Sequence, residues 1–248
     1  MTQDIESEVT QLLAGFRLPT ASAEMVARLS AAGHAAALPE VCEVLRAEAE
    51  ARRGRRVERL RRDAKLPFGK TLSALDTSRF PLRLQDQLRE LARGRFADDA
   101  INVLAFGLPG TGKTHAACAL GNALVESGRS VLFMPAYKLV QDLLGAKRDL
   151  ELPRALKKLD RFDVLILDDI GYIKQRPDEV EVLFTLMAER YERRSLIITS
   201  NLVFSEWDQI FQNPMTTAAA IDRLVHHSVI LEFDVPSYRS ERTPQETT

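Results

Sequence analysis

The sequence has little cysteine, few aromatic residues and no long apolar run, and each shortage excludes a class of protein. Its 248 residues include two cysteines, Cys42 and Cys118, which are too few for a disulfide framework and lack the spacing of a metal site. No stretch is apolar enough over a sufficient length to span a membrane, and the acidic start lacks the apolar core of a signal peptide. These absences predict a cytoplasmic globular protein, with Cys118 as a small buried thiol.

The chain as a whole also lacks an excess of positive or negative charge, because 34 Lys and Arg residues balance 35 Asp and Glu residues. The net charge of -1 therefore neither favours nor excludes nucleic acid as a partner. The average hides one basic stretch, residues 51–65, with eight basic and two acidic side chains. Two interpretations stay open for it, a solvated helix face and a surface for DNA phosphates. Its candidate DNA-binding residues are Arg52, Arg53, Arg55 and Arg56.

The chain divides into a helical part and an alternating part. Residues 1–68 show helical patterns and no strand pattern, and Pro67 with Gly69 marks the boundary to residues 69–248. From residue 101 onward, short apolar runs typical of buried strands alternate with helical stretches, including 177–193 and 216–226. The runs are 103–106, 131–134, 164–167, 196–199 and 229–233. This rhythm predicts a three-layer α/β sandwich with a parallel sheet, preceded by a small all-helical domain.

A glycine-rich phosphate loop follows the first of these runs. It reads Gly107, Leu108, Pro109, Gly110, Thr111, Gly112, Lys113 and Thr114, which fits G-x-x-x-x-G-K-[ST] between a strand and a helix. Backbone N–H groups of such a loop surround phosphate oxygens, and glycine is needed where a Cβ would block their approach. Lys113 is expected to reach the β and γ phosphates of ATP, and Thr114 to place its hydroxyl on Mg²⁺.

Polar residues end the third and fourth apolar runs, where ligands of parallel sheets bind. Asp168 is expected to hold Mg²⁺ opposite Thr114, and Asp169 to orient and polarise the water that attacks ATP. Asn201 follows the fourth run, which in sheets of this type lies between the first and the third. It either orients water near the γ phosphate or caps the next helix, and the sequence leaves both interpretations open.

Three further residues or pairs have competing interpretations. Arg223 is a candidate arginine finger, which often comes from a neighbouring subunit, although most arginines on helices are solvated or ion-paired. Trp207 is expected in the core rather than stacked on a base. His226 and His227 are adjacent, so on a helix they would point in different directions and would not share a metal ion.

Taken together, these blocks resemble the IstB-like helper ATPases of bacterial insertion sequences, which belong with the DnaC-type helicase loaders in the AAA+ class of P-loop NTPases. The resemblance covers nearly the whole chain. Its most specific blocks are Phe204-Ser-Glu-Trp207 and Asp222-Arg-Leu-Val-His-His227, in this order. The typical AAA+ ATPase has Glu where this chain has Asp169, and the shorter side chain suggests slow unaided turnover.

The resemblance implies an ATPase that binds ATP and Mg²⁺, assembles as a homo-oligomer on duplex DNA and assists a transposase encoded by the same element. It gives Arg223 the role of an arginine finger acting in trans, and adds His115 and Arg239 to the nucleotide-binding residues. It also implies DNA contacts in the segment after the second strand, with little sequence specificity. The candidates there are Tyr137, Lys138, Lys147, Arg148, Arg154, Lys157 and Lys158.

Two other functions compete with the transposition helper. A replicative helicase loader of the DnaC type would use the same ATPase fold and a different N-terminal partner. A small-molecule kinase with a phosphate loop would need a substrate pocket and a lid, and the sequence signals neither.

Overall fold

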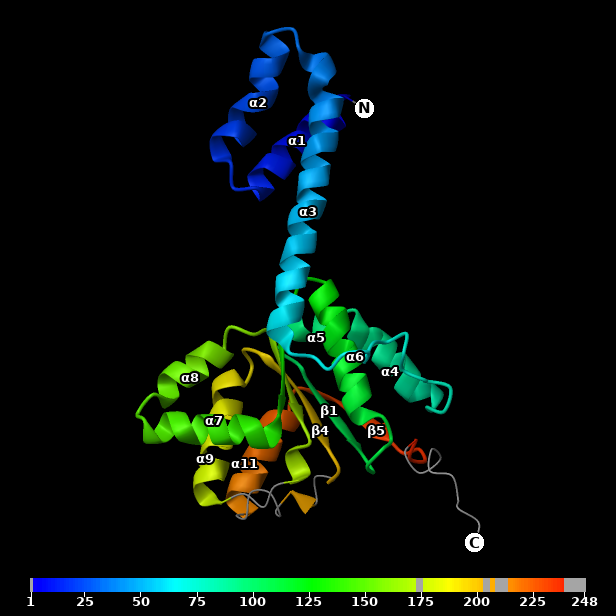
Figure 1. Cartoon of the computed structure of the whole chain (residues 1–248), viewed down its shortest axis with the longest axis vertical. Helices are drawn as coiled ribbons and strands as arrows, with labels where there is room; N and C mark the ends of the chain where they lie inside the picture. The colour runs from blue at the N-terminus through cyan, green and yellow to red at the C-terminus, as the bar shows by residue number, and fades with distance from the viewer. Residues whose placement is uncertain (1, 173–175, 203–205, 208–213, 239–248) are drawn as a thin grey trace. The chain divides into compact units, whose positions relative to one another are not determined.

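The computed structural model describes residues 2–172, 176–202, 206–207 and 214–238 (Figure 1). The chain forms two compact units, residues 1–59 and 60–248. The division falls inside a long helix, α3 (Leu38–Ala64), earlier than the change of composition around Pro67. No helix in the described ranges is long and apolar enough to cross a membrane.

The first unit is a small helical cluster. Helices α1 (Thr2–Gly15) and α2 (Pro19–Ala31) precede a 3-10 turn, η1 (Ala35–Ala37), and the start of α3. Val9, Leu13 and Cys42 form its buried centre. A double hydrogen bond from Arg46 to Glu8 lies at the surface, where such a pair stabilises little.

The second unit is a five-stranded parallel sheet with the order β2-β3-β4-β1-β5. The strands agree with the five predicted runs to within a residue or two at each end, and β4 lies between β1 and β3 as expected. The three-layer α/β prediction is therefore confirmed. Its elements are α4 (Leu82–Ala92), α5 (Arg95–Asp98), β1 (Asn102–Gly107), α6 (Lys113–Glu126), β2 (Val131–Pro135), α7 (Ala136–Arg148), α8 (Leu152–Leu159), β3 (Val164–Asp168), η2 (Ile170–Tyr172), α9 (Pro177–Arg190), β4 (Ser195–Ser200), α11 (Pro214–Val225) and β5 (Ser228–Phe233).

Helices cover both faces of this sheet (Figure 1). Side chains alternate along a strand, so Leu104 and Phe106 of β1 face the layer of α7, α9 and α11 and join the largest core cluster. On the other face α6 packs closely, since a Cβ at Gly121 would meet the Ile166 side chain at 2.7 Å. Trp207 is fully buried in the large cluster and Cys118 is buried in α6, as predicted.

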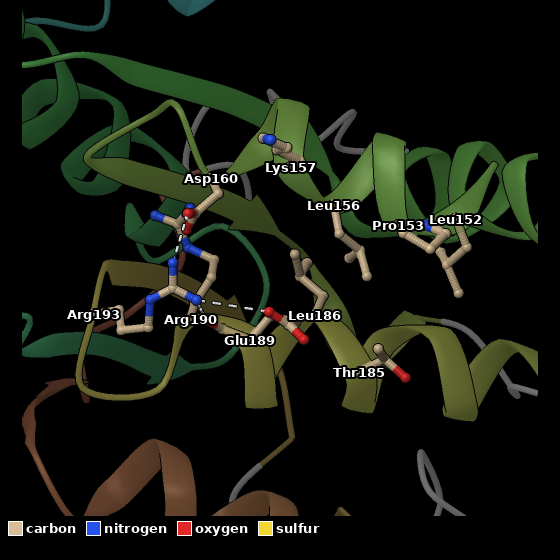
Figure 2. Close-up of a pocket in the computed structure, with 10 residues that line it drawn as sticks. All are labelled: Leu152, Pro153, Leu156, Lys157, Asp160, Thr185, Leu186, Glu189, Arg190 and Arg193. Carbon is tan, nitrogen blue, oxygen red and sulfur yellow. Dashed lines mark hydrogen bonds and ion pairs between the residues drawn. The ribbon is translucent and has the colours of Figure 1, made fainter.

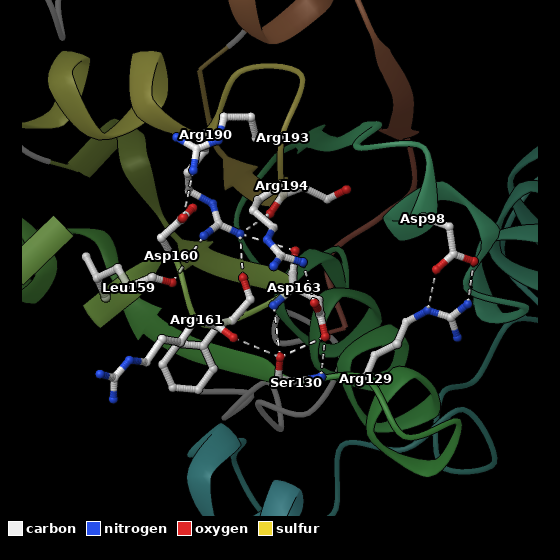
Figure 3. A network of polar contacts seen from close by, with 12 residues as sticks. Asp98, Arg129, Ser130, Leu159, Asp160, Arg161, Asp163, Arg190, Arg193 and Arg194 are labelled. Carbon is white, nitrogen blue, oxygen red and sulfur yellow. Dashed lines mark hydrogen bonds and ion pairs between the residues drawn. The ribbon is translucent and has the colours of Figure 1, made fainter. Parts of the chain in front are cut away.

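A buried arginine joins several segments at the edge where the strands begin (Figure 3). Arg190, at the end of α9, is 2% exposed and donates to the carbonyls of Leu159, Phe162, Asp163 and Ser195 at 3.0–3.2 Å. Burial lowers its pKa to about 10, so the guanidinium remains charged at neutral pH. The helix predicted over 177–193 stops at this residue, because Glu192 has a left-handed backbone (φ 54°) that leads the chain into β4.

Candidate nucleotide and DNA sites

The phosphate loop joins β1 to α6 at the edge where the strands end. The backbone geometry of the loop requires glycine at two positions. A Cβ at Gly107 would lie 2.5 Å from the Phe233 carbonyl oxygen, and Gly112 has φ 104°, a conformation that side chains disfavour. Without Cβ atoms at these positions, the backbone N–H groups of the loop stay accessible to the phosphate oxygens of a triphosphate.

Lys113, the first residue of α6, is buried against this loop. Its Nζ donates to the Gly107 carbonyl at 2.6 Å and to the Leu108 carbonyl at 2.8 Å. The ammonium thus lies inside the turn of the loop, next to the N-terminus of α6, whose dipole also favours an anion.

Thr114 and Asp168, the two residues expected to hold Mg²⁺, are in direct contact. The Thr114 hydroxyl donates to Asp168 Oδ1 at 2.7 Å, although the two residues are far apart in sequence. A hydroxyl and a carboxylate are hard oxygen donors, the kind that Mg²⁺ prefers, so this pair fits the ion. Thr199 at the end of β4 donates to the same carboxylate oxygen at 2.8 Å.

Asp169 and Asn201 are also brought together. Asn201 Nδ2 donates to Asp169 Oδ1 at 3.0 Å, which gives the amide a partner in the site. Asp169 adopts a left-handed backbone with φ 63°, and its N–H donates to Thr199 Oγ1 at 2.8 Å. Thr199 therefore positions both acids, a role that the sequence analysis missed although this threonine ends the predicted strand.

A second missed feature is the segment 70–81, which borders the phosphate loop together with Tyr238. His115 Nε2 lies 3.2 Å from the Thr71 carbonyl, and burial lowers the pKa of this imidazole. Tyr238 donates its N–H to the Gly110 carbonyl at 3.0 Å and its hydroxyl to the Asp76 carbonyl at 2.9 Å. Irregular segments of this kind have no periodicity to reveal them. Arg239, expected near the nucleotide, lies outside the described residues.

Arg223 lies in the last turn of α11, which runs toward the start of β5. It is therefore near the edge where the strands begin, whereas the phosphate loop lies where β1 ends. Its guanidinium donates to the Ala219 carbonyl at 3.1 Å and stacks on the Phe184 ring, 4.7 Å from the ring centre. Within the described structure, these contacts belong to α11 and α9 and not to the phosphate loop.

The residues proposed for DNA in the segment after β2 lie on two helices, α7 and α8. Three candidates on α8, Arg154, Lys157 and Lys158, line a hollow of about 660 Å³ together with Arg161, which was not among the predicted residues. On α7, Lys147 pairs with Glu181 at 2.6 Å and Lys138 with Asp142 at 3.5 Å, so part of their charge is neutralised locally. Tyr137 is exposed on the same helix.

A neighbouring hollow lies between α8 and α9 (Figure 2). Leu152, Leu156 and Leu186 contribute its apolar wall, and Lys157 stands at its rim (Figure 2). Its acidic residues Asp160 and Glu189 pair with Arg193. This hollow is mixed in charge, so the basic hollow on the other side of α8 suits phosphates better.

The arginines of α3 belong to the first unit. Arg52 and Arg55 both bond to Glu48, at 2.7 and 3.1 Å, and Arg52 also stacks on Phe16. Arg53 and Arg56 are exposed. Both interpretations of this stretch, a solvated face and a DNA surface, therefore remain compatible with the local structure.

Comparison with known proteins agrees with the resemblance. Over 186 residues the chain is 47% identical to an insertion sequence ATP-binding protein of Sinorhizobium fredii, covering 75% of this chain and 62% of the relative. Over 199 residues it is 40% identical to the IS21 ATP-binding protein of Pseudomonas aeruginosa, covering 80% and 75%. The chain thus spans less than two thirds of the length of the first relative.

Among solved structures, the DnaC helicase loader has a similar fold, with a TM-score of 0.53 and 18% identity over 60% of this chain and 88% of DnaC. This similarity is one of fold, and it agrees with the predicted three-layer α/β sandwich. The family described as IstB-like ATP binding protein matches residues 13–246. The chain therefore belongs to the IstB-like ATP-binding family of insertion sequences.

Proposed function

We propose that this protein is an ATP- and Mg²⁺-dependent ATPase that oligomerises on duplex DNA and assists a transposase encoded by the same element in selecting its target. One observation carries the proposal. Lys113, Thr114, Asp168, Asp169 and Asn201 gather at one edge of the sheet, whereas Arg223 lies toward the opposite edge. An arginine finger in that place serves the nucleotide of a neighbouring subunit, so activity depends on assembly.

The chemistry at the nucleotide follows from the contacts. When ATP binds, its phosphates replace the loop carbonyls as the hydrogen-bond acceptors of Lys113. A phosphate anion is a stronger acceptor for an ammonium group than a neutral carbonyl is. Thr114 and Asp168 would hold Mg²⁺, which would supply positive charge to neutralise the phosphate oxygens. Asp169, oriented by Asn201, accepts a hydrogen bond from the attacking water.

The α8 hollow is the favoured DNA contact. Its lining contains four basic side chains and one acidic side chain, Glu151. Basic side chains of this kind suit the charged phosphates of the DNA backbone. Contacts of this kind neutralise backbone phosphates and give affinity without sequence specificity. The arginines of α3 are the second candidate surface, for DNA or for the transposase.

The test is a gel shift on duplex DNA with a nonhydrolysable ATP analogue. We expect binding that requires the analogue, and loss of that binding in Lys113→Ala. A triple variant, Arg154→Ala with Lys157→Ala and Lys158→Ala, should weaken binding and flatten its dependence on salt. Arg28→Ala, which removes an exposed arginine paired within α2, is the matched control and should bind normally.

The competing function, helicase loading, predicts a different outcome. It rests on likeness of fold to DnaC alone. Absence of analogue-dependent binding to any duplex, together with binding to a replicative helicase, would replace the transposition proposal. Normal duplex binding by the triple variant would move the DNA surface away from α8 and leave the arginines of α3 as the candidate.

A further inference from the structure

A cluster of two histidines and one glutamate lies at the edge of the sheet opposite to the nucleotide site. Helix α11 ends at Val225, so His226 and His227 lie in the turn before β5, and Glu192 lies in the turn before β4. One ligand atom from each of the three side chains lies within 4.8 Å of the other two. The expectation that the two histidines point in different directions on a helix is wrong, because the helix has ended before them.

The donor set suits a zinc-class ion. Two imidazoles and one carboxylate form a common three-ligand set for Zn²⁺, which leaves a fourth position for water. His227 Nε2 lies 3.4 Å from Glu192 Oε1. Two ligands of one tetrahedral zinc, each about 2.0–2.1 Å from the ion, are separated by roughly this distance. The His226 and His227 rings are 4.3 Å apart between centres, with their planes at 73°, and one nitrogen of each ring lies within 4.8 Å of the other and of a Glu192 carboxylate oxygen.

A neighbouring tyrosine lies within hydrogen-bond distance of one of the two histidines. The Tyr191 hydroxyl lies 3.1 Å from His226 Nδ1. With a proton on Nδ1 donated to the phenol oxygen, Nε2 presents its lone pair to an ion, which is the usual way in which outer partners orient metal-binding histidines. The tyrosine and the glutamate are adjacent in one turn, so a single short segment supplies both a ligand and its support.

We infer that Glu192, His226 and His227 bind a divalent transition-metal ion, with zinc as the best fit. The bound ion joins the turn after α9 to the turn after α11, and so fixes the end of the helix that carries Arg223. Its ligands are separate from Lys113, Thr114 and Asp168, so this site goes beyond the proposed ATPase function and does not depend on it. The competing explanation is an ordinary surface pair between His227 and Glu192, with no ion between them.

The composition makes the site easy to measure. The chain has four histidines, and the two outside the cluster are His34 and His115. Both cysteines are buried, and burial raises the pKa of the Cys118 thiol to about 12, so it is a poor thiolate ligand. Zinc binding by the folded chain therefore has few competing histidine or cysteine ligands.

The experiment titrates Zn²⁺ into the tag-free full chain, without nucleotide or Mg²⁺, against a chromophoric chelator. We expect one tight equivalent per chain, and a rise in Tm on adding zinc. Glu192→Gln keeps the size of the side chain and should weaken binding at least tenfold, as should His226→Ala with His227→Ala. Tyr191→Phe should weaken it by about tenfold, the usual effect of losing an outer partner. His34→Ala is the control and should bind as the unaltered chain does.

Two results would overturn the inference. One is the absence of saturable binding by the unaltered chain, which would leave the surface ion pair as the explanation. The other is binding by Glu192→Gln and by the double histidine variant with unchanged affinity, which would place the zinc elsewhere. Thermal unfolding of each variant without zinc identifies any variant that has lost its fold, and Glu192→Gln, a conservative change at an exposed residue, still tests the site in that event.

Discussion

The two edges of the sheet contain the same kind of interaction, a buried cation bonded to backbone carbonyls, but it has a different role at each edge. At each edge a buried cation donates to backbone carbonyls, Lys113 where the strands end and Arg190 where they begin. Lys113 bonds to carbonyls five and six residues away in its own loop. Arg190 bonds mainly to carbonyls 27 to 31 residues away, at the end of α8 and in the turn before β3, as well as to Ser195.

The difference in range explains the difference in role. A cation bonded within one loop can exchange those carbonyls for phosphate oxygens while the rest of the fold stays in place. A cation bonded to three separate segments cannot move without breaking their association. Buried charge by itself therefore does not mark a functional site. What distinguishes the two edges is whether the partners of the charge are local or lie far along the chain.

Substitution of Arg223 has the largest expected effect. It tests whether this arginine, unlike Arg190, takes part in ATP hydrolysis. Because its contacts are a carbonyl of its own helix and the Phe184 ring, Arg223→Ala should fold normally. Loss of an arginine finger should lower DNA-stimulated ATP hydrolysis by about 10³-fold. Steady-state phosphate release measures this. Mixing Arg223→Ala with Lys113→Ala should restore part of the activity, since one subunit supplies the finger and the other the phosphate loop.

Complete absence of rescue in that mixture would contradict a finger in trans. Gel filtration with DNA and the ATP analogue serves as its control, because both variants must enter one assembly for the test to count. Normal hydrolysis by Arg223→Ala alone would mean that Arg223 has no role in catalysis and is a solvated arginine stacked on Phe184.

Arg190 should show the opposite behaviour. Arg190→Met leaves the carbonyls of Leu159, Phe162, Asp163 and Ser195 without their donor in a buried place. We expect the free energy of unfolding to fall by about 3–5 kcal/mol, as it does when a buried charged network is broken. Urea unfolding followed by circular dichroism measures it. Arg193→Met, an exposed arginine nearby, should cost at most about 1 kcal/mol. Equal losses in both variants would contradict the role given to long-range partners.

Asp169 separates nucleotide binding from hydrolysis at the opposite edge. Asp169→Asn retains the size of the side chain and its contact with the Asn201 region, so ATP should bind nearly as before. Hydrolysis should fall by about 10²-fold or more, because an amide cannot accept a proton from the attacking water. Fluorescent-nucleotide titration and single-turnover hydrolysis measure the two steps. Unchanged turnover would remove Asp169 from its proposed role.

Particular residues show how far the sequence leads. The strands, the phosphate loop and the pairing of Thr114 with Asp168 follow from short patterns and from the rule that parallel strands end at one edge. Thr199 was missed because a threonine in a strand is ordinary, and its contact with Asp168 exists only once β3 and β4 are neighbours. Arg190 was missed for a similar reason, since its carbonyl partners lie at the end of α8, in the turn before β3 and at the start of β4, and these segments meet only in the fold.

The smallest expected effect concerns acidity and again compares the edges. Burial lowers the pKa of His115, whose ring contacts the Thr71 carbonyl, so the fold favours the neutral imidazole. The unfolded chain then binds more protons as the pH falls below about 6.5, the ordinary pKa of histidine, and stability decreases there. Arg190, with a pKa of about 10, stays charged throughout this range and adds no such dependence. His115→Gln should therefore lose less stability than the unaltered chain between about pH 7 and pH 5 in parallel urea unfolding series. Identical slopes in the two series would mean that the imidazole by the phosphate loop is not what makes this edge sensitive to acid.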